Sequence, residues 1–209
     1  MRRPAWTSFA GTLAITFGLA AWISAAPAGR LPQAATATVR PVVLNFDASA
    51  SKVHYTVDST LHTVHGTFNV KGGTIQFDPQ TGKAEGEIVV SAASGESGNS
   101  SRDERMHKEI LESWKYQVAT FRPTQIDGQV SLASPSDFKV KGIVNLHGTD
   151  HEVVAVVHSE FAGDRWKGTA KFDIPYIKWG IKDPSNFLLK VKPVVNIEFD
   201  MAGTQSAAQ

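Results

Sequence analysis

The stretch Phe138–Val157, FKVKGIVNLHGTDHEVVAVV, decides the fold class. Every second residue of its first half is apolar or glycine, and the residues between them are mostly polar. In the second half Val153, Ala155 and Val157 continue every second position, although Val154 and Val156 between them are also apolar. A period of two is typical of a β-strand with one buried face. Since His147–Asp150 fits a tight turn between the halves, the stretch predicts an antiparallel hairpin.

Similar runs recur from Val42 onward about every 8–12 residues, the spacing expected of a β-sandwich or barrel. Further strands are predicted at residues 52–57, 74–77, 85–91, 166–174 and 195–201, with turns at 78–82 and 162–165. About eight strands with short connections can remove their unpaired edges by closing on themselves. We therefore predict an all-β fold, an eight-stranded antiparallel barrel.

One segment departs from the β pattern. Ser101 and Glu104 have the spacing of a capping box, with Ser101 as the predicted N-cap. Met106, Ile110 and Leu111 then fall at helical spacing, opposite several charged residues. This pattern predicts one short amphipathic helix near an end of the barrel.

The N-terminus has the composition of a secretory signal peptide. Arg2 and Arg3 precede an uncharged stretch that lasts until Arg30, and small residues follow its apolar part at 24–28. We predict a signal peptide at 1–28, a linker at 29–41, the β-domain at 42–203 and a tail at 204–209. The protein is then periplasmic or secreted. The alternative is an uncleaved membrane anchor, because the stretch is just long enough to span a bilayer.

Composition excludes several classes of function. The 209 residues include no cysteine, which excludes disulfides, thiolate metal sites and a cysteine nucleophile. The 21 basic and 20 acidic residues nearly balance, so there is no electrostatic signature for nucleic acid and none is predicted as a partner.

The interior of such a barrel can hold its own side chains or one small ligand. Glycines within strands, at 66, 86, 142 and 168, favour bends or free space. The aromatic residues Trp166, Phe172, Tyr176, Trp179 and Phe187 suit either a lining or an ordinary core. Both possibilities stay open on composition alone.

Several segments together resemble the YceI family over roughly residues 44–203. They are Gly66-Thr67-Phe68, Gly73 to Pro79, Gly98 to Asp103, Met106-His107, Val118 to Arg122, and Gly142 to Gly148 leading to Asp150. The resemblance implies a lipocalin-like, elongated barrel with a helix near its mouth. It also implies export and the binding of a polyisoprenoid lipid or isoprenoid quinone in an apolar tunnel. The chain departs from the family pattern at 112–117 and 176–180.

Alternation and resemblance together predict the ligand-binding residues, which are apolar and face inward. They are Val57, Phe68, Ile75, Phe77, Ile88, Val90, Phe121, Val144, Leu146, Phe172, Ile174, Val195, Ile197 and Phe199, with Met106, Ile110 and Leu111 closing one end. No resident cofactor is predicted; the bound molecule would be the isoprenoid lipid or quinone itself. Transient membrane contact and the oligomeric state stay open.

Two other functions compete with ligand binding. One is an envelope stress-associated barrel that acts through its surface without a lipid cargo. The other is an enzyme, which we do not predict, since the chain has no G-x-S-x-G, H-E-x-x-H or phosphate-loop motif.

Polar candidates for a site are few. His62 and His65 point to opposite faces of a strand, and His147 with His151 flanks a turn, so no metal site is predicted. Arg102 either meets a ligand head group at the mouth or pairs locally, while Asp103 supports the helix N-terminus.

Overall fold

The computed structural model describes residues 40–207. The predicted signal peptide and nearly all of the predicted linker lie outside this range. Nine strands are present: β1 Val42–Phe46, β2 Lys52–Asp58, β3 Thr63–Phe77, β4 Ala84–Ser91, β5 Val118–Asp127, β6 Ser136–Leu146, β7 Thr149–Ala162, β8 Arg165–Ile174 and β9 Val195–Ala207. A 3₁₀ turn, η1 (Ala92–Ser94), precedes the helix α1 (Ser100–Arg105) and a π-helical turn, η2 (Met106–Ile110).

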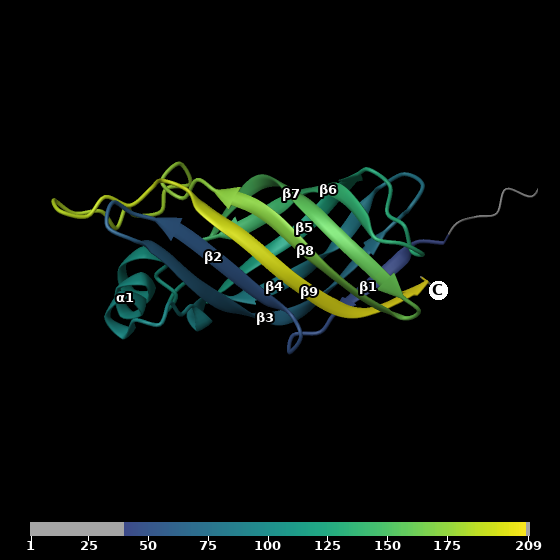
Figure 1. The fold of residues 1–209 in the computed structure, drawn as a ribbon, viewed down its shortest axis with the longest axis horizontal. Helices are drawn as coiled ribbons and strands as arrows, with labels where there is room; N and C mark the ends of the chain where they lie inside the picture. Colours follow the sequence, from purple (N-terminus) through teal and green to yellow (C-terminus); the bar gives the residue numbers. More distant parts are fainter. Residues whose placement is uncertain (1–39, 208–209) are drawn as a thin grey trace, which may run out of the picture. The chain divides into compact units, whose positions relative to one another are not determined.

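The strands close into an antiparallel barrel with eight positions (Figure 1). β3 to β9 follow one another around the wall, and β1 and β2 share the position between β9 and β3. Residues 47–51 separate β1 from β2 at this position. There the Ala202 backbone N–H donates a 3.1 Å hydrogen bond to the Ser51 hydroxyl. The predicted eight-stranded barrel is therefore confirmed, with one of its positions built from two short strands.

The hairpin predicted from Phe138–Val157 is present as β6 and β7. Its register pairs Val144 with His151 and Val140 with Ala155. His147 and Gly148 turn the chain in left-handed conformations, with φ of 54° and 78°. Such a two-residue turn matches the twist of the strands that it joins.

The glycines within the strands do not leave free space. A Cβ atom at Gly66 would lie 2.4 Å from the Tyr55 ring, and one at Gly142 would lie 2.5 Å from the Phe121 ring. These neighbouring rings lie over the glycines and take the volume that a side chain would need. The inference from glycine to free space was wrong, because the adjacent strand decides what fills the position.

The helix begins earlier than the capping box predicts. Asn99 is the N-cap, and its side chain accepts a 3.0 Å hydrogen bond from the Arg102 backbone N–H. Gly98, with φ of 76°, turns the chain just before it. Asn and Ser are about equally good N-caps, so residue type does not distinguish Asn99 from Ser101. The turn at Gly98 selects Asn99, and the prediction of Ser101 as the N-cap was wrong. Among the described residues, no helix is long and apolar enough to cross a membrane.

The end of the barrel away from α1 is packed with side chains. Val42, Phe77, Ala84 and Ile126 form a buried cluster there. β9 continues through this end to Ala207, which pairs with Val42. Residues 204–207 are therefore part of the sheet, and their assignment to a tail was wrong.

Candidate functional site: an apolar cavity inside the barrel

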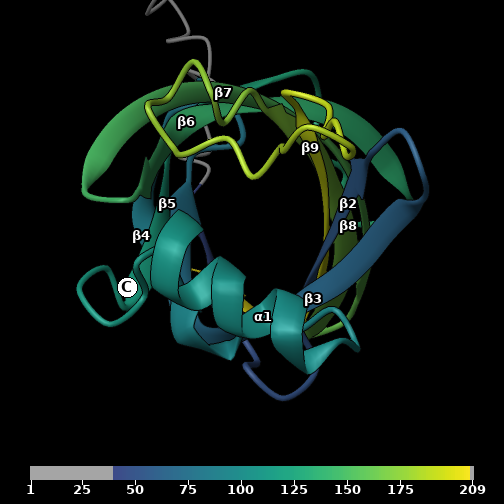
Figure 2. The ribbon, with the colours of Figure 1, turned by 90° about the vertical axis from the view of Figure 1, so that its left-hand side faces the viewer.

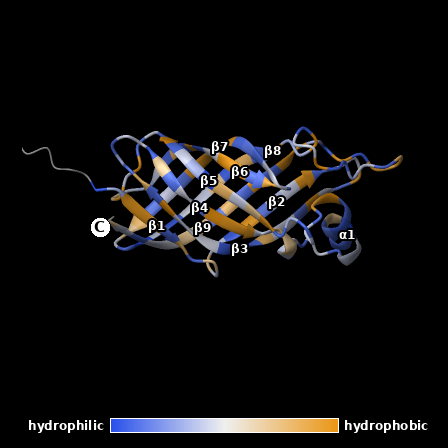
Figure 3. Cartoon of the chain, turned by 180° about the vertical axis from the view of Figure 1, so that it is seen from behind, coloured by the Kyte–Doolittle hydropathy of each residue, from blue (hydrophilic) through white to orange (hydrophobic). Residues whose placement is uncertain are grey.

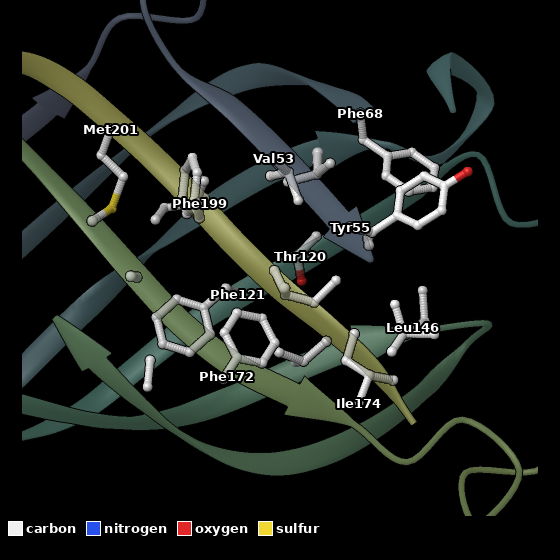
Figure 4. Close-up of a pocket in the computed structure, with 18 of the residues that line it drawn as sticks. Val53, Tyr55, Phe68, Thr120, Phe121, Leu146, Phe172, Ile174, Phe199 and Met201 are labelled. Carbon is white, nitrogen blue, oxygen red and sulfur yellow. The ribbon is translucent and has the colours of Figure 1, made fainter. Parts of the chain in front are cut away.

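The barrel encloses a cavity of about 400 Å³ whose walls are almost entirely aliphatic and aromatic. Along β9 the inward residues are Val195, Ile197, Phe199 and Met201. Six residue steps of a strand cover about 20 Å, so the cavity is elongated along the strands. Figure 4 shows such side chains from several strands converging on it. The volume falls in the range of small-molecule sites, about 300–1,000 Å³.

Every residue that the sequence predicts as ligand-binding lines this cavity. These are Val57, Phe68, Ile75, Phe77, Ile88, Val90, Met106, Ile110, Leu111, Phe121, Val144, Leu146, Phe172, Ile174, Val195, Ile197 and Phe199. They come from seven of the nine strands, all except β1 and β7, and from the helical segment. That they contact a ligand stays a prediction.

Sequence reasoning missed part of the lining. On the strands the missed residues include Val53, Tyr55, Ala155, Val157, Ala170 and Met201, which share the alternation of the residues that were found. Extending the runs on β2, β8 and β9 by one or two alternate positions would have found Val53, Tyr55, Ala170 and Met201. Ala155 and Val157 belong to β7, whose spacing the sequence shows but from which no lining residue was predicted. The connection between β8 and β9 has no periodic pattern that would predict lining residues. It nevertheless contributes Tyr176, Ile181, Leu189 and Val191.

The helical segment and the β8–β9 connection, residues 175–194, lie at the same end of the barrel. Figure 2 looks onto this end, with α1 crossing one side of it and the connection the other. Met106, Ile110 and Leu111 turn toward the cavity. The Lys182 ammonium joins the two segments by a 2.9 Å ion pair with Glu109. The predicted position of the helix near an end is confirmed.

Ser97 holds the start of α1 in place. Its hydroxyl accepts a 2.7 Å hydrogen bond from Arg102 Nε and donates to the Asp103 carboxylate. Its backbone carbonyl accepts a second bond from Arg102, at 2.9 Å. Desolvation acts to raise the pKa of Asp103, but the bonds from Ser97 and the charge of Arg102 outweigh it and keep the pKa below its usual value. Arg102 thus pairs locally while also bordering the cavity.

Two tyrosines lie buried at this end. The Tyr55 hydroxyl reaches Met106 Sδ at 3.7 Å, and burial raises the pKa of Tyr55. The Tyr176 hydroxyl is buried without a hydrogen-bond partner among the described residues. Burial, with a smaller contribution from Asp183, raises the pKa of Tyr176 to about 12. Both hydroxyls are therefore neutral at physiological pH.

The histidines do not converge. His147 Nε2 lies 2.8 Å from Glu112 Oε2, whereas the His151 ring stacks on Trp179 with 4.1 Å between ring centres. His65 bonds to Thr56 on the outside of the barrel, while His62 borders the cavity. Within residues 40–207, no group of three or more His, Cys, Asp or Glu side chains is arranged to hold a metal ion.

A family model, the YceI-like domain, matches residues 44–202, which is most of the chain. The chain belongs to the YceI-like family. The resemblance drawn from the sequence is thereby confirmed. No curated protein matches the sequence at a significant level.

Solved structures show the same fold at low sequence identity. BcnA of Burkholderia cenocepacia is 18% identical with a TM-score of 0.64, over 76% of this chain and 99% of that one. A polyisoprenoid-binding domain from Saccharophagus degradans, implicated in plant cell wall breakdown, is 17% identical with a TM-score of 0.56, over 79% and 98%. The YceI protein of Campylobacter jejuni is 15% identical with a TM-score of 0.55, over 68% and 84%.

The departures from the pattern of the YceI-like family gather at the helix end. Glu112 bonds to His147, and Tyr116 lies over Gly148, so residues 112–116 join the helical segment to the β6–β7 turn. Trp179, from the second departure, stacks on His151 at the start of β7. Both segments in which the sequence departs from the pattern of the resemblance therefore lie at the helix end.

Proposed function

We propose that the protein binds an elongated apolar ligand, such as a polyisoprenoid lipid or an isoprenoid quinone, in the barrel cavity, and carries or stores it in the cell envelope. The observation that carries this proposal is a 400 Å³ cavity with an almost uninterrupted apolar lining. The likeness to a polyisoprenoid-binding domain supports the same class of ligand. Export to the envelope rests on the composition of residues 1–28.

The energetics favour a long ligand over a short one. Each buried CH₂ contributes roughly 0.8 kcal/mol, so ten carbons give roughly 8 kcal/mol. Association costs about 4–15 kcal/mol before any net affinity appears. A short hydrocarbon therefore barely balances the cost, whereas a chain of twenty carbons exceeds it. The walls supply few polar partners, so chain length and shape would select the ligand more than its head group.

The alternatives predict a different interior. A barrel that acts only through its surface would fill its centre with its own side chains, as the packed end does. An enzyme would bring polar groups together within the cavity. Of the polar residues that border this cavity, Ser59, Thr120 and Ser159 are spread over different strands and loops. Of the two arginines of α1, Arg102 bonds to Ser97 and Arg105 pairs with Glu109. The proposal is accordingly a binding protein without catalysis.

Two adjacent residues of β7 offer a matched test. Val157 is 7% exposed and lines the cavity, whereas Val156 is 53% exposed on the outer face. Val157→Phe places a ring in the cavity, and Val156→Phe places the same ring in solvent. Organic extraction and native mass spectrometry of protein purified from cells would measure the apolar ligand bound per chain.

We expect wild type and Val156→Phe to carry a long-chain apolar molecule, and Val157→Phe to carry at least fivefold less, in line with a loss of about 1 kcal/mol. Circular dichroism checks that both variants fold. Recovery of no apolar molecule from the wild type, or equal recovery from both variants, would contradict the proposal.

A further inference from the structure

Three exposed apolar side chains lie together at the helix end of the barrel. Phe187 is 94% exposed, Leu188 79% and Leu61 72%. Leu61 belongs to the β2–β3 turn and the other two to the β8–β9 connection. The two loops are bonded to each other: the Thr60 backbone N–H donates to the Lys190 carbonyl at 2.9 Å. We call Leu61, Phe187 and Leu188 the apolar tip.

Figures 1 and 3 show where these loops lie. The β8–β9 connection and the β2–β3 turn extend beyond the strands at the end that carries α1. In Figure 3 the outermost part of the longer loop is hydrophobic. The β8–β9 connection, which carries Phe187 and Leu188, is thus the outermost part of the barrel domain at the end where the cavity is bordered by loops (Figure 1).

The loop that carries the tip is held in a defined turn. The Asn186 side-chain oxygen accepts hydrogen bonds from the backbone N–H groups of Leu188, at 2.9 Å, and Leu189, at 2.8 Å. The Asn186 backbone N–H donates to the Leu189 carbonyl at 2.8 Å. Leu189 lines the cavity, whereas Phe187 and Leu188 stay in solvent. The turn therefore presents two apolar side chains outward although the cavity lies next to them.

Lysines outnumber acidic residues in the loop that carries Phe187 and Leu188. Residues 175–194 contain four lysines and one aspartate, in a chain whose 21 basic and 20 acidic residues otherwise balance. Lys182 pairs with Glu109 and Lys192 with Asp58. Lys178 and Lys190 form no ion pair among the described residues and are exposed. Apolar side chains beside free lysines are the combination that binds the interface of an anionic membrane.

We propose that the apolar tip inserts into the surface of an anionic phospholipid bilayer and so seats the mouth of the cavity on the membrane. The inference rests on the proposed function, because a bilayer is where a long apolar ligand would be collected or delivered. A second copy of the chain suits the surface less well. A two-fold contact through the tip would bring the same lysines together from both copies.

Vesicle flotation tests the proposal. The protein is purified from cells that express the full chain, and its measured mass defines its N-terminus. The vesicles contain phosphatidylcholine alone or with an equal share of phosphatidylglycerol. The test variant is Phe187→Ser/Leu188→Ser. The matched control is Val154→Thr/Val156→Thr, which removes two exposed apolar side chains, 51% and 53% exposed, from the barrel wall.

We expect the wild type and the control to bind the anionic vesicles and the tip variant to bind at least about tenfold more weakly. Binding should weaken with added salt and without phosphatidylglycerol. Any residual N-terminal segment is the same in all three proteins. Equal binding of the tip variant and the control would overturn the proposal.

A site-specific readout is possible because the chain has no cysteine. Leu188→Cys carrying an environment-sensitive fluorophore should show a blue shift on anionic vesicles. The control is Leu132→Cys, which lies in the loop before β6 at the opposite end and is 42% exposed in the wild type. A shift at both positions or at neither would overturn the proposal, as would a Leu188→Cys shift on dimerisation without vesicles.

The two proposals can fail separately. If the tip variant loses vesicle binding but extracted protein holds no apolar molecule, the membrane surface stands and the cargo does not. If cargo is recovered but vesicles bind all variants equally, the cavity stands and the docking surface does not.

Discussion

The two ends of the barrel differ in how they are built. At the end away from α1, Phe77 is 2% exposed and packs in a cluster of buried side chains, and Trp166 donates a 3.1 Å hydrogen bond to the Thr204 carbonyl. At the helix end, neither α1 nor η2 contains a buried residue. The 20 residues between β8 and β9 contribute no strand there. The end away from α1 is built like a protein core. We call the segments at the other end, α1, η2 and residues 175–194, the cover.

The two ends should therefore differ in the free energy that is needed to open them. The cover is held by a small number of polar contacts, including the bonds of Ser97 to Arg102 and the ion pair between Lys182 and Glu109. Regions with few buried apolar contacts open at lower free energy than the core. The helical segment should then open at lower free energy than the sheet.

The largest effect should come from shortening a core residue at the packed end. Phe77 borders the cavity but also packs against buried neighbours on its other side, so in ligand-stripped protein Phe77→Ala is expected to reduce the free energy of unfolding by about 3–5 kcal/mol. Ile110→Ala, at the cover, removes a partly exposed side chain and should cost less than about 2 kcal/mol. Urea denaturation followed by circular dichroism compares the two. Similar losses would show that the cover contributes to the core as much as the packed end does.

The sequence predicts the wall of the barrel much better than its cover. Alternation shows which face of a strand is buried. Once one inward residue is identified, every second residue along the strand also faces inward, as from Val195 to Phe199 on β9. The cover has no such period. Tyr176 and Leu189 line the cavity because of the way in which the loop at residues 175–194 folds over the end of the barrel. No local sequence pattern predicts that course. The N-cap was misplaced because the chain offers Asn99 and Ser101, and only the turn at Gly98 distinguishes them.

A smaller effect should come from acid at the cover. The pKa of Asp103 is below its usual value, because the bonds from Ser97 and the charge of Arg102 outweigh desolvation. A carboxylate with a lowered pKa stabilises the fold above its unfolded pKa, about 3.9, and this stabilisation is lost as the pH falls through the folded value. Below about pH 4 the amides of α1 should lose protection from hydrogen exchange before those of β6 and β7.

The variant Asp103→Asn isolates this contribution from the other carboxylates. Its α1 amides, corrected for intrinsic exchange rates, should already be less protected at pH 6, by less than about tenfold, since one pKa unit corresponds to tenfold. Acid should then change them less than in the wild type, the remaining response coming from Glu104 and Glu109, whose pKa values are lowered by Lys108 and Lys182. If α1 in the variant responds to acid as it does in the wild type, the bond between Ser97 and Asp103 does not hold the cover.

The smallest effect concerns the two buried tyrosines at the helix end of the barrel. Tyr176→Phe removes a buried hydroxyl that has no partner among the described residues, so the free energy of unfolding should stay unchanged or rise by up to about 1 kcal/mol. Tyr55→Phe is the control, because it removes a hydroxyl that bonds to Met106 and should lower stability slightly. Thermal unfolding of ligand-stripped protein measures both. If Tyr176→Phe lowers stability only in protein that holds its extracted ligand, that ligand carries a polar group which bonds to Tyr176, and the apolar lining is then not the whole basis of recognition.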